Sequence, residues 1–415
     1  MSARTAFDLI FRNTRTRSSA TPVDIGVSGG RIAAIEPRLA GDAPEIDVGG
    51  KLALPGFVDT HIHLDKACLL GRCGHNHRSV SDAIQAVAAM KRDFTVEDVY
   101  ARGARVLERA IVHGTTRMRT HVEIDPRIAL RGFEAVKALK RDYAWAIDLS
   151  ICVFPQEGLT NNPGTEELMR SALADGATVV GAAPYTDADP RAQIDRVFEM
   201  ARDFDADIDM HLDLGDAPEH MDVEYVCDVT ARYRYGGRVA IGHVTKLSLV
   251  GPERFEAIAQ RLADAGIAVT VLPSTDLYLM GRHASHSVPR GVLPAHRLLH
   301  SGVNCSLSTN NLLNPFTPFG DCSLVRMANL YANVCHVGTP HDLGECLAMI
   351  TERPARLLRL DDYGLTPGKT ADLVVLDCET QAQAIAELAS PLMGFKRGRR
   401  TFTRAPVALH RPTAA

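Results

Sequence analysis

The sequence has no marked excess of either charge, no long hydrophobic run and no closely spaced cysteines. Its 46 Lys and Arg residues and 50 Asp and Glu residues leave a net charge of -4, which argues against a nucleic-acid or membrane-surface partner. No apolar run reaches the ~20 residues of a membrane helix, and the start lacks the apolar core of a signal peptide. The nine cysteines include no Cys-x-x-Cys motif, which favours reduced thiols over a disulfide framework. We therefore expect a cytoplasmic protein without a nucleic-acid or membrane partner.

Through the middle of the chain, apolar runs typical of strands alternate with longer amphipathic stretches typical of helices. The expected strands cover residues 52–58, 116–122, 146–154, 179–183, 208–212, 239–243, 268–272 and 303–307. The expected helices cover residues 80–92, 96–113, 131–141, 165–175, 191–203, 223–233, 252–265 and 343–353. About eight strand-plus-helix units over ~300 residues favour an α/β fold of the (β/α)8 TIM-barrel type over a doubly wound sheet.

Both ends of the chain contain short strands instead. Near the start, two short apolar segments flank the glycine-rich turn Ser28-Gly29-Gly30, a pattern that predicts a hairpin. The segment after Gly368 has a similar pattern. We expect residues 1–55 and 363–415 to form one small β domain, with residues 56–362 in the barrel.

Five histidines lie where the expected strands end. They are His61, His63, His121, His211 and His243. Side chains alternate along a strand, so the first two leave the same face. Active sites of TIM barrels collect at the C-terminal ends of the strands, and imidazoles are common ligands of divalent metal ions. A buried histidine is more often a hydrogen-bonded core residue than a ligand, but five at strand ends indicate a shared metal site.

Several motifs resemble the amidohydrolase superfamily, and within it the cytosine deaminase and N-isopropylammelide amidohydrolase-like branch. They are GFVDTHIHLDK at residues 56–66, RTHV at 119–122, VFPQEG at 153–158 and NPFTPFG at 314–320. The Phe-Pro-Gln-Glu-Gly element is specific to this branch, whereas His-x-His is widespread in the superfamily. The resemblance extends over nearly the whole chain and implies a barrel of the metal-dependent hydrolase type beside a small β-sandwich built from both termini.

The resemblance also implies a reaction. Water activated by one divalent metal ion, zinc or iron, would attack an sp² carbon of a small nitrogen heterocycle or cyclic amide, and a carbon–nitrogen bond would break. The implied metal ligands are His61, His63 and His211, and His243 would hydrogen-bond the attacking hydroxide or the tetrahedral intermediate. Relatives are commonly oligomeric, so we expect a homo-oligomer.

The residues that the resemblance places around the substrate are polar or aromatic. Gln156 would present its amide to a ring carbonyl and N–H, and Phe316 would stack on the flat ring. Lys66 and Asn311 would line the site, and His121 is a further candidate for substrate contact.

Two positions depart from the pattern of this branch. Leu214, in His211-Leu212-Asp213-Leu214, stands where the branch has a proton-shuttling glutamate. Asn310 stands where the superfamily has an aspartate that serves as metal ligand and general base. An amide oxygen can coordinate a metal, but an amide accepts no proton at neutral pH, which argues against cytosine itself as the substrate.

Three interpretations of these departures remain open. In the first, another group is the base, with His243 as the leading candidate and Asp213, Asp276 or His121 as alternatives. In the second, catalysis is lost and the protein binds a small heterocycle without turnover. In the third, Asn310 is a laboratory change that traps a substrate. We expect a working hydrolase, and if the missing base limits its rate, Asn310→Asp should raise the activity.

Overall fold

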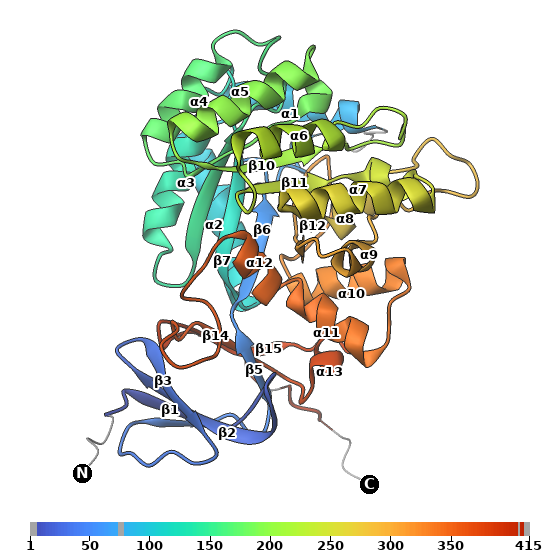
Figure 1. Cartoon of the computed structure of the whole chain (residues 1–415). Helices are drawn as coiled ribbons and strands as arrows, with labels where there is room; N and C mark the ends of the chain where they lie inside the picture. The colour runs from blue at the N-terminus through green and yellow to red at the C-terminus, as the bar shows by residue number, and fades with distance from the viewer. Residues whose placement is uncertain (1–5, 74–78, 406, 411–415) are drawn as a thin grey trace.

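The computed structural model describes residues 6–73, 79–405 and 407–410, and its largest part is an eight-stranded parallel barrel (Figure 1). Its strands follow one another in chain order as β6 (Phe57–Ile62), β7 (Thr115–Glu123), β8 (Asp148–Phe154), β9 (Val179–Val180), β10 (Asp207–Leu212), β11 (Val239–His243), β12 (Ile267–Val271) and β13 (Cys305–Leu307). The backbone of Asn310 closes the barrel, because its N–H donates to the His61 carbonyl (2.8 Å) and its carbonyl accepts from the His63 N–H (3.0 Å). The predicted (β/α)8 barrel is confirmed.

Helices surround the barrel and fill its connections (Figure 1). They are α1 (Val80–Met90), α2 (Val96–Val112), α3 (Arg131–Asp142), α4 (Thr165–Ala174), α5 (Pro190–Asp203), α6 (Val223–Tyr233), α7 (Pro252–Ala265), α8 (Pro273–Leu279), α9 (Ala295–His300), α10 (Leu324–Cys335), α11 (Pro340–Ala348), α12 (Glu352–Leu357) and α13 (Gln381–Ala386). Helix α2 is representative: the Thr95 side chain caps its first turn, and Val99, Val106 and Leu107 bury one face. Among the described residues no helix is long and apolar enough to cross a membrane.

The helix expected over residues 343–353 was wrong in its extent. The structure ends α11 at Ala348 and begins α12 at Glu352, and the backbone of Thr351 between them is not helical (φ -128°, ψ -96°). The amphipathic pattern continues across the break, so periodicity alone could not locate it.

Strands from both ends of the chain form a second, mixed sheet. They are β1 (Leu9–Thr16), β2 (Ser19–Ser28), β3 (Arg31–Glu36), β4 (Glu45–Asp47), β5 (Leu52–Pro55), β14 (Leu373–Leu376), β15 (Pro391–Lys396) and β16 (Arg399–Thr403). Strands β14 and β5 pair antiparallel, which joins the two ends. The sheet buries its own core, where the rings of Phe11 and Phe395 lie 4.7 Å apart between centroids. The expectation that the termini build one small β domain is confirmed.

Residues 52–58 form two strands instead of the single one expected. Strand β5 belongs to the mixed sheet and β6 to the barrel, so the chain passes between the two sheets at Gly56. A Cβ atom at Gly56 would lie 2.3 Å from the side chain of Thr116, and the passage therefore requires glycine. This passage places His61 at the end of the first barrel strand.

Candidate metal centre and active site

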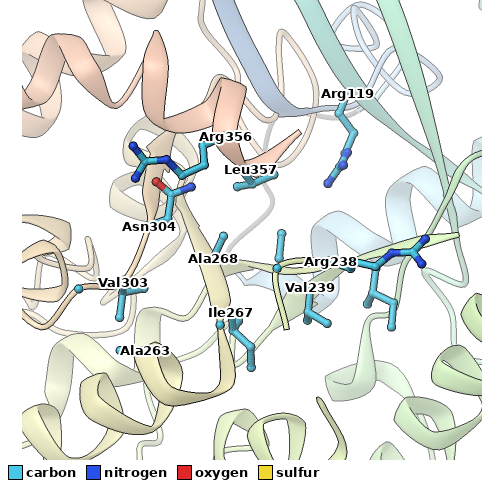
Figure 2. Close-up of a pocket in the computed structure, with 15 residues that line it drawn as sticks. Arg119, Arg238, Val239, Ala263, Ile267, Ala268, Val303, Asn304, Arg356 and Leu357 are labelled. Carbon is cyan, nitrogen blue, oxygen red and sulfur yellow. The ribbon is translucent and has the colours of Figure 1, made fainter. Parts of the chain in front are cut away.

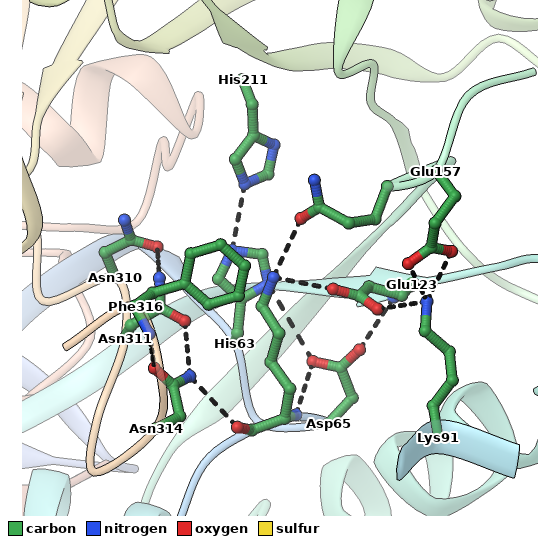
Figure 3. A network of polar contacts seen from close by, with 12 residues as sticks. His63, Asp65, Lys91, Glu123, Glu157, His211, Asn310, Asn311, Asn314 and Phe316 are labelled. Carbon is green, nitrogen blue, oxygen red and sulfur yellow. Dashed lines mark hydrogen bonds and ion pairs between the residues drawn. The ribbon is translucent and has the colours of Figure 1, made fainter. Parts of the chain in front are cut away.

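Three histidine nitrogens meet at the C-terminal end of the barrel. The Nε2 atoms of His61 and His63 each lie 3.0 Å from Nε2 of His211. Figure 3 shows the rings of His63 and His211. All three side chains are at most 2% exposed. Burial lowers the pKa of each imidazole well below its ordinary value, which leaves the rings neutral at pH 7. Neutral imidazoles offer the lone pairs that a metal ion needs.

These contacts fit a metal ion better than a set of hydrogen bonds. A single N–H on His211 serves one acceptor, yet two nitrogens lie at hydrogen-bond distance from the same atom. In tetrahedral zinc sites with Zn–N bonds of about 2.1 Å, neighbouring nitrogen ligands lie about 3.4 Å apart, near the observed spacing of 3.0 Å. The Nδ1 atoms of the three rings have no hydrogen-bond partner among the described residues. The donor set is therefore suited to one divalent ion.

His121 is also part of the histidine cluster. Each of His61, His121 and His211 has one ring nitrogen within 4.8 Å of a ring nitrogen of both others. The His121 ring is stacked on that of His61 with centroids 3.8 Å apart. Its Nε2 lies 3.5 Å from the Asp209 carboxylate, however, whereas His63 directs its Nε2 at His211. We therefore retain His63 as the third ligand of the candidate centre and place His121 beside it.

His243 lies next to the same cluster and is paired with a carboxylate. Its ring centroid is 5.6 Å from that of His211, and its Nδ1–H donates to Oδ1 of Asp276 (2.6 Å). The other Asp276 oxygen accepts from the Leu272 N–H (3.1 Å), which fixes the carboxylate at the start of α8. A proton on Nδ1 leaves the lone pair of His243 on Nε2. The geometry therefore gives His243 one nitrogen that can accept a proton.

The predicted substrate residues Lys66, Gln156 and Phe316 lie together. The Lys66 Nζ donates to Oε1 of Gln156 (3.0 Å) and lies 4.4 Å from the centre of the Phe316 ring. The Gln156 Nε2 is buried and has no hydrogen-bond partner within the described part of the chain. Gln156 therefore binds Lys66 through its oxygen and has an amide nitrogen that can donate to a substrate.

Asn310 and Asn311 form part of a chain of amides (Figure 3). The Asn311 Nδ2 donates to Oδ1 of Asn310 (3.0 Å), and the Asn314 Nδ2 donates to Oδ1 of Asn311 (2.7 Å). The Asn310 Nδ2 is buried without a partner in the described residues. The Asn310 backbone bonds both His61 and His63, which places this residue beside the histidine cluster.

The carboxylate of Asp213, one of the alternative bases, has a structural role. Its two oxygens accept from the backbone N–H groups of Asp222 (2.9 Å) and Val223 (3.0 Å), at the start of α6. Burial raises the pKa of Asp213 to about 6. The adjacent Leu214 packs in an apolar cluster that includes Phe316. We therefore do not assign Asp213 a part in the chemistry.

A buried ion network that was not predicted from the sequence lies beside Gln156. The Lys91 Nζ lies 2.6 Å from Glu123, 2.7 Å from Asp125 and 2.6 Å from Glu157, and Figure 3 shows Lys91 between Glu123 and Glu157. Glu123 also binds Lys66 (2.7 Å), so the network reaches the substrate residues. Burial and the nearby Glu123 raise the pKa of Glu157 to about 8, which reduces the negative charge around Lys91 at neutral pH. The position of Glu157 next to Gln156 was the only signal in the sequence.

Lys91→Met should destabilise the protein strongly. Lys91 is 1% exposed, so its removal leaves buried carboxylates without their cation, at a cost of about 3–5 kcal/mol in the free energy of unfolding. As a control, Lys137→Met removes a pair with Asp175 on the surface, worth less than about 1 kcal/mol. Urea denaturation of both variants measures the difference. Equal losses would contradict the importance of the buried network.

A cavity of about 160 Å³ lies at the opposite end of the barrel (Figure 2). Its wall includes Val239 and Ile267, the first residues of β11 and β12, and the side chain of Arg119. Because the histidines lie at the C-terminal ends of the strands, this cavity is separate from the candidate active site.

The chain is similar to known proteins over nearly its whole length. Residues 52–401 match the model of the amidohydrolase family. The chain belongs to the amidohydrolase family. It is 30% identical over 404 residues to N-isopropylammelide isopropyl amidohydrolase of Pseudomonas sp. strain ADP, covering 95% of this chain and 96% of that protein.

Solved structures of family members have the same fold. The 5-methylcytosine deaminase of Klebsiella pneumoniae liganded with 5-fluorocytosine superposes with a TM-score of 0.93 at 28% identity, covering 97% of this chain and 99% of that one. N-isopropylammelide isopropylaminohydrolase of Burkholderia multivorans gives a TM-score of 0.84 at 27% identity, covering 94% and 97%. The predicted family and branch are confirmed.

Proposed function

We propose that this amidohydrolase is a working, metal-dependent hydrolase of a small, flat, oxo-substituted nitrogen heterocycle. The observation that carries the proposal is the convergence of the His61 and His63 Nε2 atoms on Nε2 of His211. These three residues would hold one divalent ion, zinc or iron. When bound, such an ion supplies an activated water molecule at neutral pH.

His243 is the proposed base. Its Nδ1–H is held by Asp276, so Nε2 can take the proton of the attacking water and return it to the leaving nitrogen. Asn310 cannot accept that proton, and both oxygens of Asp213 bind the start of α6. The protonated His243 would be stabilised by the Asp276 carboxylate 2.6 Å away.

The substrate residues favour a ring that carries hydrogen-bond acceptors. Lys66 and Gln156 offer donors, and ring carbonyl oxygens would accept from them. Leu214 packs in an apolar cluster with Phe316, at the position where a glutamate would protonate a ring nitrogen. An apolar side chain at this position favours an alkylated amine over free ammonia as the leaving group. The name of the Pseudomonas relative describes such a substrate, an N-isopropyl-substituted ring.

The proposal is tested on metal-loaded enzyme with three rings: N-isopropylammelide, 5-methylcytosine and cytosine. We expect release of isopropylamine from the first to be faster than release of ammonia from the other two. Faster turnover of 5-methylcytosine would show that Leu214 does not select the leaving group. Stoichiometric metal without turnover of any such ring would favour the alternative function, a heterocycle-binding relative without catalysis.

Asn310→Asp separates the working hydrolase from an impaired relative. The aspartate can still accept from the Asn311 Nδ2, and its second oxygen replaces an unpartnered amide nitrogen. If His243 already serves as base, the rate should change by less than about tenfold, whereas restoring a missing base is worth ~10²–10⁴-fold. Steady-state kinetics on the best substrate measure the change, and a gain of the larger size would contradict the role of His243.

A further inference from the structure

We propose that Asp209 is a positioning residue that holds the rings of His61 and His121 from inside the barrel. The inference rests on the proposed metal centre. Asp209 lies on β10 two residues before His211, so both side chains leave the same face of that strand. Its side chain is fully buried, although a carboxylate inside a protein requires partners.

The two oxygens of Asp209 have different surroundings. Oδ2 accepts from Nη1 of Arg119 (2.9 Å). Oδ1 has no hydrogen-bond partner among the described residues, but it lies 3.8 Å from Nδ1 of His61 and 3.5 Å from Nε2 of His121. Those two nitrogens also lack a partner within the described part of the chain. Buried polar groups are seldom left unpaired. The closeness of Asp209 Oδ1 to these two ring nitrogens therefore indicates that the carboxylate orients both rings.

The position of this carboxylate suits a histidine that binds a metal. His61 can offer the lone pair of Nε2 only when its proton is on Nδ1, and Oδ1 of Asp209 lies 3.8 Å from that Nδ1 without another hydrogen-bond partner among the described residues. Metal-bound histidines commonly donate their second ring N–H to a carboxylate, which fixes both the tautomer and the ring orientation. His121 is stacked on His61 and lies near the same oxygen, so it restrains the ring from its face.

Arg119 supplies the charge that keeps this carboxylate in the barrel interior. It is 3% exposed, pairs with Asp209 (2.9 Å) and also lines the cavity at the far end of the barrel (Figure 2). Arg119 and His121 are two residues apart on β7, and their side chains therefore reach Asp209 from one face of that strand. Arg119 and His121 on β7, together with Asp209 on β10, thus position the rings of the proposed metal ligands.

The test compares the isosteric variant Asp209→Asn with the full-length parent. Competition with a chromogenic chelator should show metal affinity about 10- to 100-fold weaker, because the support of His61 is lost. Asp207→Asn is the matched control, since Asp207 lies on the same strand but pairs with Arg238 and Arg359. We expect its metal affinity to stay close to that of the parent. Thermal unfolding verifies that both variants are folded.

A second measurement distinguishes positioning from a general loss of stability. In the cobalt-substituted protein, the visible absorption bands report ligand geometry, and we expect them to shift in Asp209→Asn but not in Asp207→Asn. Parental affinity and an unchanged spectrum in folded Asp209→Asn would overturn the inference. If Asp209→Asn does not fold, metal affinity and the cobalt spectrum are measured on Arg119→Lys instead. Parental values of both would again overturn the inference. A parent protein that binds no metal would instead contradict the proposed function.

Discussion

Replacing His211 by alanine is expected to abolish stoichiometric metal binding and, with it, hydrolysis. The Nε2 atom of His211 is the one on which both His61 and His63 converge, so its removal leaves two imidazoles where a catalytic centre has three protein ligands. Without the ion no activated water forms at neutral pH. Metal content measured on purified protein, together with turnover of the best substrate, tests this expectation.

The control for this variant is a histidine outside the cluster. His283 is exposed, lies 3.4 Å from Asp216 and has no part in the buried histidine cluster. His283→Ala should keep both metal and activity. Equimolar metal in His211→Ala would contradict the proposed ligand set and would direct attention to His121 as the alternative ligand.

Replacing His243 by alanine should lower kcat by ~10²–10⁴-fold while the metal content stays the same. The expected size is that of a positioned acid–base group, because His243 lies beside His211 and Asp276 holds one of its two ring nitrogens. Rate and metal content are measured on the same preparation. A parallel loss of metal would show that His243 is a ligand instead of a base.

His243→Gln refines the test. A glutamine can still hydrogen-bond to Asp276 and to the intermediate, but it accepts no proton. If His243 is the base, the glutamine variant should be as slow as the alanine variant. Recovery of most of the rate by glutamine would mean that His243 acts only as a hydrogen-bond donor.

The sequence predicted the barrel well because its strands are short apolar runs with clear ends. Residues 239–243 were expected as a strand and form β11 with the same limits. The extent of the strand expected over residues 52–58 was wrong because the split at Gly56 depends on Thr116, 60 positions away in the chain. The domain limits, the cytoplasmic location and the homo-oligomer stay predictions.

The histidines of the candidate site could be singled out because they are chemically distinctive and lie at strand ends, where a barrel brings them together. Asp209 was overlooked, although a charged residue inside the apolar strand of residues 208–212 was a signal. Lys91 could not be recognised, because its importance comes from carboxylates at the end of β7 and in the connection after β8. The capping role of Asp213 likewise depends on where α6 begins.

The central claim is that His61, His63 and His211 bind one divalent ion, and anomalous X-ray diffraction from crystals of the metal-loaded protein tests it most directly. The account predicts one anomalous peak about 2.0–2.2 Å from the Nε2 atom of each of the three rings. A peak bound by other residues, or well-ordered rings with no peak between them in protein that holds equimolar metal, would contradict it.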